Sequence, residues 1–215
     1  MAKKQAQKPQ KQMKQKVKNK KAVKKVFFEV SAPLTSTRIH LYASSPQELE
    51  GRTIKIDLTK SLRGKNLELK MRIKNEKEGL VGIPESAKLA STYVKRIVRK
   101  GTDYSEDSIL ASCRDLEVRI KPLMVTRRRV SKKILAALRE SARKQLISHL
   151  KTRDAEEIFS EIISNKLQKQ LAVKLKKIYP LALCEIRMFE VLGKIKETEK
   201  EEPEEKKVDS KEEKA

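Results

Sequence analysis

The first half of the chain alternates apolar and polar residues in the manner of β-strands. Ile54, Ile56 and Leu58 alternate with polar neighbours, and a second alternating run covers residues 67–73. A period of two places alternate side chains on one face, as a half-buried strand requires. The two runs predict a hairpin whose loop, residues 59–66, is basic and contains a glycine free to take positive φ. Further strands are predicted at residues 26–30, 38–42, 116–120 and 182–191.

A short helix is predicted between these strands. Its apolar stripe would consist of Ala90, Tyr93, Val94 and Ile97. Ser86 follows Pro84 and is placed to cap the first turn, and Gly101 would lie just past the end. The other face of this helix carries Lys and Arg residues.

The second half of the chain predicts three further helices. Apolar residues recur at helical spacing over residues 131–151, which indicates a long amphipathic helix with an outward basic face. Asp154 and Glu157 resemble a capping box that opens a short helix running through Ile163. Leu residues from 167, with Ile178 as the last apolar position, predict a third helix that Pro180 stops.

This order of elements predicts an α+β fold, in which an antiparallel sheet or partly closed β-barrel is packed with helices. Residues 1–25 carry 11 Lys and no acid, and residues 196–215 carry 6 Lys and 9 acids with almost no hydrophobic residues. Such segments bury too little apolar surface to offset their ordering entropy. We therefore expect a Lys-rich disordered arm at 1–25, a single α+β domain at 26–195, and a mixed-charge disordered tail at 196–215.

Net charge then narrows the class of partner. The chain carries 52 Lys and Arg against 29 Asp and Glu, a formal net charge of +23. An excess of this size favours a polyanion, because each cation that neutralises a phosphate releases condensed counterions. The arm contributes +11 and the tail −3, so the 170 residues between them retain +15. The predicted domain is therefore basic in its own right.

An anionic membrane is the rival polyanion. No run of the sequence approaches the ~18 apolar residues that span a bilayer, and no charged-then-apolar leader opens the chain. We therefore expect a cytoplasmic protein with no membrane partner, and nucleic acid as the polyanion.

Basic residues gather at several places. The densest cluster lies at the junction before the long helix, where the planar guanidinium groups of three arginines suit bidentate binding of phosphate oxygens. Any one cluster is about as well explained as a solvated face, and it is their combination with the arm that favours binding. The candidate RNA-binding residues are Lys14, Lys16, Lys18, Lys20, Lys21, Lys24, Lys25, Arg63, Lys65, Lys95, Arg96, Arg99, Lys100, Arg127, Arg128, Arg129, Lys132 and Lys133.

Aromatic residues are few, with four Phe, four Tyr and no Trp. Proteins that stack single-stranded bases need exposed aromatic platforms. Most of the aromatic residues fall on predicted core faces, namely Phe27, Phe28, Tyr93, Phe159 and Phe189. Tyr42 and Tyr104 are the candidates for exposure. We therefore expect recognition of structured RNA by backbone and shape, with little reading of sequence.

Signals for catalysis, metals or cofactors are poor. Cys113 and Cys184 are too few and too far apart for a disulfide framework, and pooling them with His40 and His149 matches no zinc-site spacing. We expect buried thiols, no metal and no cofactor. An acidic cluster of Asp103, Glu106 and Asp107 could hold magnesium, although a loop with capping residues explains it better. No Gly-rich phosphate loop is present.

Four segments together resemble one family. Residues 49–58 (LEGRTIKIDL) resemble a strand motif of the archaeal and eukaryotic small-subunit ribosomal protein three-A family, also called the eukaryotic-type small ribosomal subunit protein one family. Residues 25–33 (KVFFEVSAP) resemble its opening strand, the basic stretch from Thr126 resembles a later block, and residues 177–181 (KIYPL) resemble another. The resemblance runs in order over residues 25–196, and the length is similar to that of archaeal members.

The resemblance implies a structural, non-enzymatic constituent of the small ribosomal subunit. It implies a place on the platform near the messenger-RNA exit, with small-subunit ribosomal RNA and neighbouring small-subunit proteins as partners. Messenger RNA and initiation factors are further candidate partners. Three alternatives stay open at this point: a transient RNA-binding translation or ribosome-assembly factor, an RNA-modifying or RNA-cleaving enzyme that uses the acidic cluster, and a DNA-compacting protein.

Overall fold

The computed structural model describes residues 24–35, 37–76 and 79–194. These residues divide into two compact units: unit 1 holds those up to Ile56 together with 69–85, and unit 2 holds 57–68 and those from Ser86 onward. The predicted arm and tail lie outside the described residues, apart from Lys24 and Lys25. The single domain predicted over residues 26–195 stays a prediction.

Unit 1 is built of β-strands and one 3₁₀ turn. Its elements are β1 (Val26–Ser31), β2 (Ile39–Ala43), η1 (Pro46–Leu49), β3 (Thr53–Asp57), β4 (Leu67–Glu76) and β5 (Gly79–Leu89), the last three of which also extend into unit 2. β1 pairs antiparallel with β2, whereas its other edge pairs with β5 in parallel at Val30 and Leu80. The predicted sheet is therefore confirmed, but it is mixed and not wholly antiparallel.

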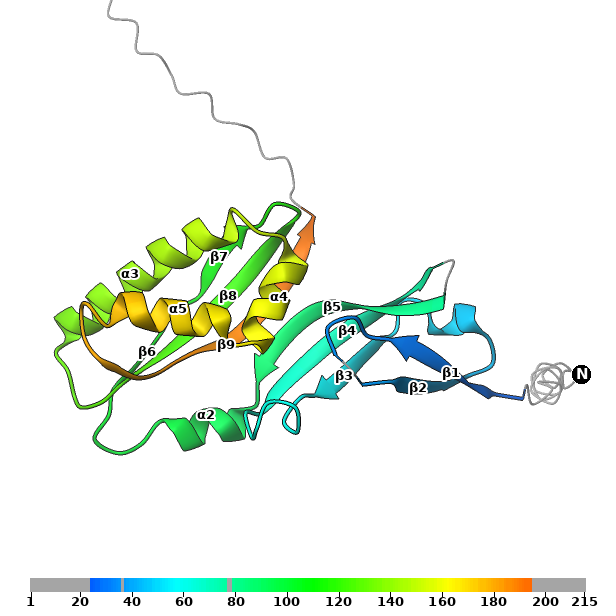
Figure 1. The fold of residues 1–215 in the computed structure, drawn as a ribbon, viewed down its shortest axis with the longest axis horizontal. Coiled ribbons are helices and arrows are strands. Elements are labelled where there is room, and N and C mark those ends of the chain that lie inside the picture. Colours follow the sequence, from blue (N-terminus) through cyan, green and yellow to red (C-terminus); the bar gives the residue numbers. More distant parts are fainter. Residues whose placement is uncertain (1–23, 36, 77–78, 195–215) are drawn as a thin grey trace, which may run out of the picture. The chain divides into compact units, whose positions relative to one another are not determined.

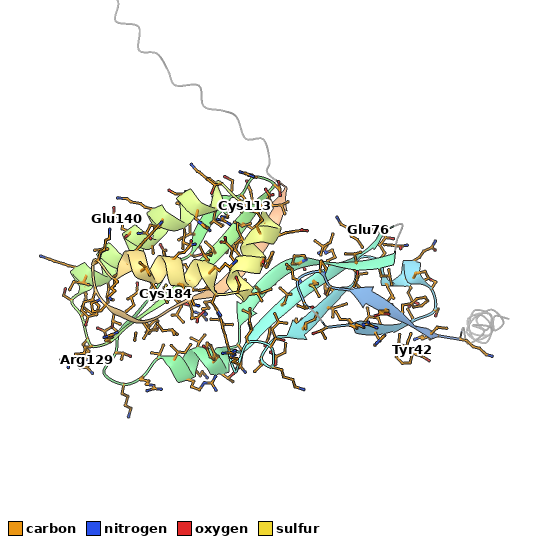
Figure 2. The ribbon with its side chains drawn as sticks, in the orientation of Figure 1. Tyr42, Glu76, Cys113, Arg129, Glu140 and Cys184 are labelled. Carbon is orange, nitrogen blue, oxygen red and sulfur yellow. The ribbon has the colours of Figure 1, made fainter. Side chains whose placement is uncertain are left out.

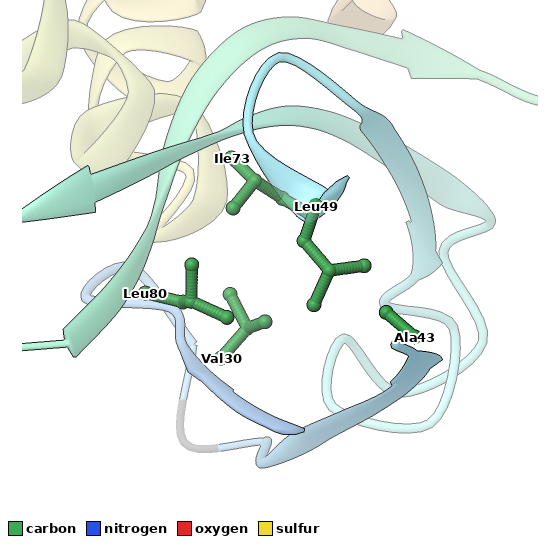
Figure 3. Packing of buried hydrophobic residues seen from close by; sticks show 5 residues of the cluster. All are labelled: Val30, Ala43, Leu49, Ile73 and Leu80. Carbon is green, nitrogen blue, oxygen red and sulfur yellow. The ribbon is translucent and has the colours of Figure 1, made fainter. Parts of the chain in front are cut away.

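The core of unit 1 forms where the alternating strands turn the same face inward. Five buried side chains from β1, β2, η1, β4 and β5 point toward one another in Figure 3: Val30, Ala43, Leu49, Ile73 and Leu80. The alternating run predicted over residues 67–73 places all four of its apolar side chains in buried positions. The period of two thus identified the buried face of β4, from which Ile73 enters this core.

Unit 2 is a sheet covered by helices. Its remaining elements are α2 (Ser91–Ile97), β6 (Tyr104–Glu106), β7 (Ile109–Ser112), β8 (Leu116–Thr126), α3 (Lys132–Leu150), α4 (Ala155–Ile163), α5 (Lys166–Leu175) and β9 (Leu181–Lys194). β8 pairs antiparallel with β9 on one side and with β6 and β7 on the other. α3, α4 and α5 lie over the strands β6 to β9 in Figure 1. The α+β class is confirmed, and the strands of the described part form an open sheet.

Phe159 and Phe189 form the centre of the helix-to-sheet packing in unit 2. Phe159 lies on α4 and Phe189 on β9, both side chains are fully buried, and their ring centroids are 4.7 Å apart in an edge-to-face arrangement. Edge-to-face contact places the positive edge of one ring on the negative face of the other. The prediction that these two residues belong to the core is confirmed.

The prediction of a core position for Phe27 is wrong. Its side chain is 68% exposed, because Phe28 and Val30 take the inward positions of β1 and their neighbour projects from the opposite face. There it packs against Tyr42 of β2, with ring centroids 5.0 Å apart. The expected exposure of Tyr42 and Tyr104 is confirmed, and Tyr42 is labelled in Figure 2.

Two predicted helix ends also differ, and one predicted capping hydrogen bond is not made. Ser86 lies inside β5, where it pairs with Glu190, so the short helix α2 begins only at Ser91 after the N-cap residue Ala90. Asp154 is the N-cap of α4 as predicted, but its side chain makes no capping hydrogen bond. α5 ends at Leu175, and Ile178 lies outside it with a 41% exposed side chain. The long-range pairing with β9 prevails over the local helix-start pattern at Ser86.

Candidate nucleic-acid interface

Most of the basic residues predicted to bind RNA are exposed in unit 2. Within the predicted set, ten residues of this unit have exposed side chains. They lie in the loop after β3, on and after α2, and between β8 and the first turn of α3. We call them the basic set of unit 2: Arg63, Lys95, Arg96, Arg99, Lys100, Arg127, Arg128, Arg129, Lys132 and Lys133. Lys24 and Lys25 are exposed residues of unit 1, whereas Lys14, Lys16, Lys18, Lys20 and Lys21 lie outside the described residues.

The arginine turn, residues 127–130, is held in place by two residues that carry no positive charge. The buried hydroxyl of Thr126 accepts a hydrogen bond from the amide of Asp103 at 3.1 Å and donates one to the carbonyl oxygen of Arg128 at 2.7 Å. At the other end, the Asp103 carboxylate accepts the amide of Val130 at 2.8 Å. These bonds fix the backbone, so three arginines that repel one another are presented together; Figure 2 labels Arg129 in this turn.

The acidic cluster is engaged by groups of the chain itself. Asp103 closes the arginine turn, Glu106 accepts Arg187 at 2.6 Å, and Asp107 accepts Arg143 at 2.9 Å. In the described part of the chain, no group of three or more His, Cys, Asp and Glu side chains is arranged to hold a metal ion. The geometry thus supports a structural role for these acids. Sequence analysis also favoured that role over a magnesium site.

Three arginines from separate segments line one hollow. Arg96 and Arg99 come from α2 and the residues after it, and Arg127 comes from the arginine turn. The hollow has a volume of about 440 Å³ and lies between α2, the end of β8 and the start of β9. We call it the arginine hollow. These residues belong to two separate basic clusters of the sequence, and the fold brings them to the walls of one hollow.

Arg96 is held with its guanidinium plane in a defined position. Its Cζ lies 5.1 Å from the centroid of the Tyr93 ring, and its Nη2 donates to the carbonyl oxygen of Gly64 at 3.1 Å. Gly64 has φ of 89°, a left-handed conformation that glycine adopts without steric cost, as the sequence predicted for this loop. Burial raises the pKa of the Tyr93 phenol, so this ring stays neutral beside the arginine. Sequence analysis assigned Tyr93 only to the core and missed this pairing.

Lys65 is the exception among the predicted residues of unit 2. Only 6% of it is exposed, and its Nζ lies 2.5 Å from a Glu185 carboxylate oxygen and 2.6 Å from the Asn165 side-chain oxygen. A buried ammonium needs such partners, because burial removes it from water. The side chain therefore ties the β3–β4 loop to the start of α5 and to β9, and it is not available to a phosphate. We leave Lys65 out of the interface.

The basic set of unit 2 differs in its ion pairing from three arginines of the same unit. Within the described residues, no carboxylate lies within the 4.0 Å ion-pair distance of any of its ten members. By contrast, Arg143, Arg153 and Arg187 each pair with an acid of the same unit. Exposed cations that repel one another and pair with no internal acid are suited to an external polyanion.

The two cysteines are buried free thiols, as predicted. Burial raises the pKa of Cys113 to about 11 and that of Cys184 to about 12, and the charges of Asp115 and Glu185 add to the two shifts. Both thiols therefore stay protonated at neutral pH and are poor nucleophiles. His149 lies 2.7 Å from Glu161, which also pairs with Arg153, so the position of this histidine is structural. No helix in the described ranges is long and apolar enough to cross a membrane.

Comparison with known proteins gives a consistent result. Residues 12–194 match the model of the ribosomal S3Ae family. The small ribosomal subunit protein eS1 of Nanoarchaeum equitans is 27% identical over 175 residues, which cover 77% of this chain and 88% of that protein. The eS1 protein of Pyrobaculum islandicum is 31% identical over 178 residues, which cover 78% and 79% of the two chains. The eS1 protein of Methanothrix thermoacetophila is 27% identical, with 79% and 84% covered. With the family model spanning most of its length, this chain belongs to the ribosomal S3Ae family.

Proposed function

We propose that this chain is a structural constituent of the small ribosomal subunit, which binds ribosomal RNA through the basic set of unit 2. The observation that carries the proposal is a group of exposed cations around a turn that other residues hold in place. Ten exposed cations, three of them in a turn fixed by Asp103 and Thr126, have no acidic partner among the described residues. The names of the relatives, all small ribosomal subunit protein eS1, support the same assignment.

The role proposed here is not enzymatic. The acids that an RNA-cleaving enzyme would require are engaged with the arginine turn, Arg143 and Arg187. Arginine matches phosphate oxygens with a planar pair of donors, so the arginine turn would bind the RNA backbone with little dependence on base sequence. We propose that this chain lies on the platform of the cytoplasmic small subunit, near the messenger-RNA exit. There it would contact small-subunit RNA and neighbouring proteins.

The arginine turn provides the test of RNA binding. Replacing Arg127, Arg128 and Arg129 with Gln should preserve the fold, because their side chains are exposed and the turn is held by other residues. If all three bind phosphates, the slope of log affinity against log salt should shrink by about 2 to 3, since each contact contributes roughly 0.7 to 0.9. The measurement is a salt titration against a small-subunit ribosomal RNA fragment, with circular dichroism to confirm folding.

A matched variant controls for net charge. Arg38, Arg52 and Arg72 of unit 1 are partly or fully exposed, and each pairs with a glutamate, so their replacement with Gln removes the same three charges. Arginines already paired within the chain should contribute less to counterion release. We expect the salt slope of this control to stay close to that of the wild type. Equal slopes for the two triple variants would contradict the proposed interface.

A further inference from the structure

The interior of the arginine hollow has a chemistry that phosphate binding alone does not explain. Arg96, Arg99 and Arg127 contribute its cations, whereas the half-buried side chains of Ile97 and Leu183 contribute apolar surface from α2 and the start of β9. A phosphate gains nothing from apolar surface, because contact with it removes water from the charged oxygens and supplies no hydrogen bond in return. The ligand that fits both parts has an anionic group joined to a flat, largely apolar one.

Arg96 supplies a flat surface within this hollow. Its guanidinium group lies over the Tyr93 ring, and the hydrogen bond to Gly64 limits rotation of the plane. Guanidinium planes stack on nucleobases as aromatic rings do, and a plane that is already fixed loses little entropy when a base is added. A base stacked on Arg96 would be the third flat group in this arrangement, after the Tyr93 ring and the guanidinium group.

We propose that the arginine hollow takes a single unpaired nucleotide extruded from ribosomal RNA. Its base would stack on Arg96 over the apolar surface of Ile97 and Leu183, and Arg99 and Arg127 would bind the flanking phosphates. The volume of about 440 Å³ lies within the roughly 300–1,000 Å³ typical of sites for small organic ligands. This proposal rests on the proposed RNA-binding function and adds to it a nucleotide site where the sequence indicated only backbone contacts.

Ala182 offers a way to close the hollow without changing its charge. This residue is exposed on β9 and lines the hollow. Ala182→Trp should fill the space while retaining every arginine, and Ala182→Ser should leave it open as a matched control. Arg96→Lys is a second variant, which keeps the charge but removes the flat plane. Circular dichroism checks that each variant is folded.

The probe is an RNA hairpin with one bulged 2-aminopurine, compared with the same hairpin lacking the bulge. The wild-type chain and Ala182→Ser should bind the bulged hairpin roughly tenfold more tightly, a gain in the range of base stacking on a protein side chain. Ala182→Trp and Arg96→Lys should both lose this preference. Ala182→Trp, which retains every arginine, should still bind the fully paired hairpin within about twofold of the wild type, because phosphate contacts remain.

Equal wild-type affinity for the two hairpins would overturn the nucleotide site and leave RNA binding intact. A bulge preference that both Ala182→Trp and Arg96→Lys retain would overturn it as well. Weak binding of both hairpins with no dependence on salt would instead reject the RNA-binding function itself. A glutamate-rich peptide serves as the rival ligand: if it binds more tightly than either RNA and Ala182→Trp abolishes that binding, the hollow is a protein-binding site.

Discussion

Replacing Lys65 with methionine should destabilise the chain by about 3–5 kcal/mol, the usual cost of removing one partner of a buried ion pair. The Lys65 side chain is 7% exposed and that of Glu185 is 11% exposed, so water cannot replace the lost ammonium. Asn165 would lose its hydrogen-bond donor in the same change. Chemical denaturation followed by circular dichroism measures the free energy of unfolding.

Two variants control this measurement. Lys144 pairs with Glu140 on the exposed face of α3, where the two side chains are 76% and 68% exposed, so Lys144→Met should leave stability nearly unchanged. Combining Lys65→Met with Glu185→Leu removes both buried charges and should restore much of the lost stability. A Lys65→Met variant as stable as Lys144→Met would mean that Lys65 reaches solvent, and it would return to the list of RNA-binding candidates.

Phe159→Ala should also cost about 3–5 kcal/mol of stability. Its side chain is fully buried between α4 and β9, and the substitution removes the packing of the ring and its edge-to-face contact with Phe189. The cavity left behind adds to the cost, because protein cores relax only partly around a missing ring. The same denaturation experiment reports the change.

Phe27→Ala is the matched control, since it makes the same substitution at a side chain that is 68% exposed. The substitution removes the contact with Tyr42 and little buried surface, so we expect a cost of at most about 1 kcal/mol. Similar losses for the two variants would contradict the placement of Phe159 in the core or that of Phe27 on the surface.

Local sequence patterns correctly predicted those elements whose buried face follows from strand or helix periodicity alone. The alternation over residues 67–73 and the apolar stripe of α3 each identify a buried face correctly, because strand and helix periods act within a few residues. The start of α2 was misplaced for the opposite reason. Ser86 follows a proline and resembles a cap, but its backbone pairs with Glu190, and no local pattern reveals a partner about a hundred residues away.

The sequence likewise predicted some residues of the interface and missed the arrangement of others. Exposed basic clusters such as Arg127–Arg129 are evident from composition. The identity of Lys65 as a buried structural cation is not, because Glu185 lies 120 residues further along the chain. The convergence of Arg96, Arg99 and Arg127 on one hollow likewise depends on how α2 packs beside the ends of β8 and β9. Sequence composition thus indicates the kind of ligand, and the fold selects which cations remain free for it.

Stoichiometric residence on the small ribosomal subunit tests the central claim most directly. Small subunits from cells that express the tagged chain should be washed in high salt, sedimented through a sucrose gradient, and the chain quantified against ribosomal RNA in each fraction. A structural constituent should remain at one copy per small subunit. Recovery at the top of the gradient, or well below one copy per subunit, would contradict the claim and identify a transient translation or assembly factor.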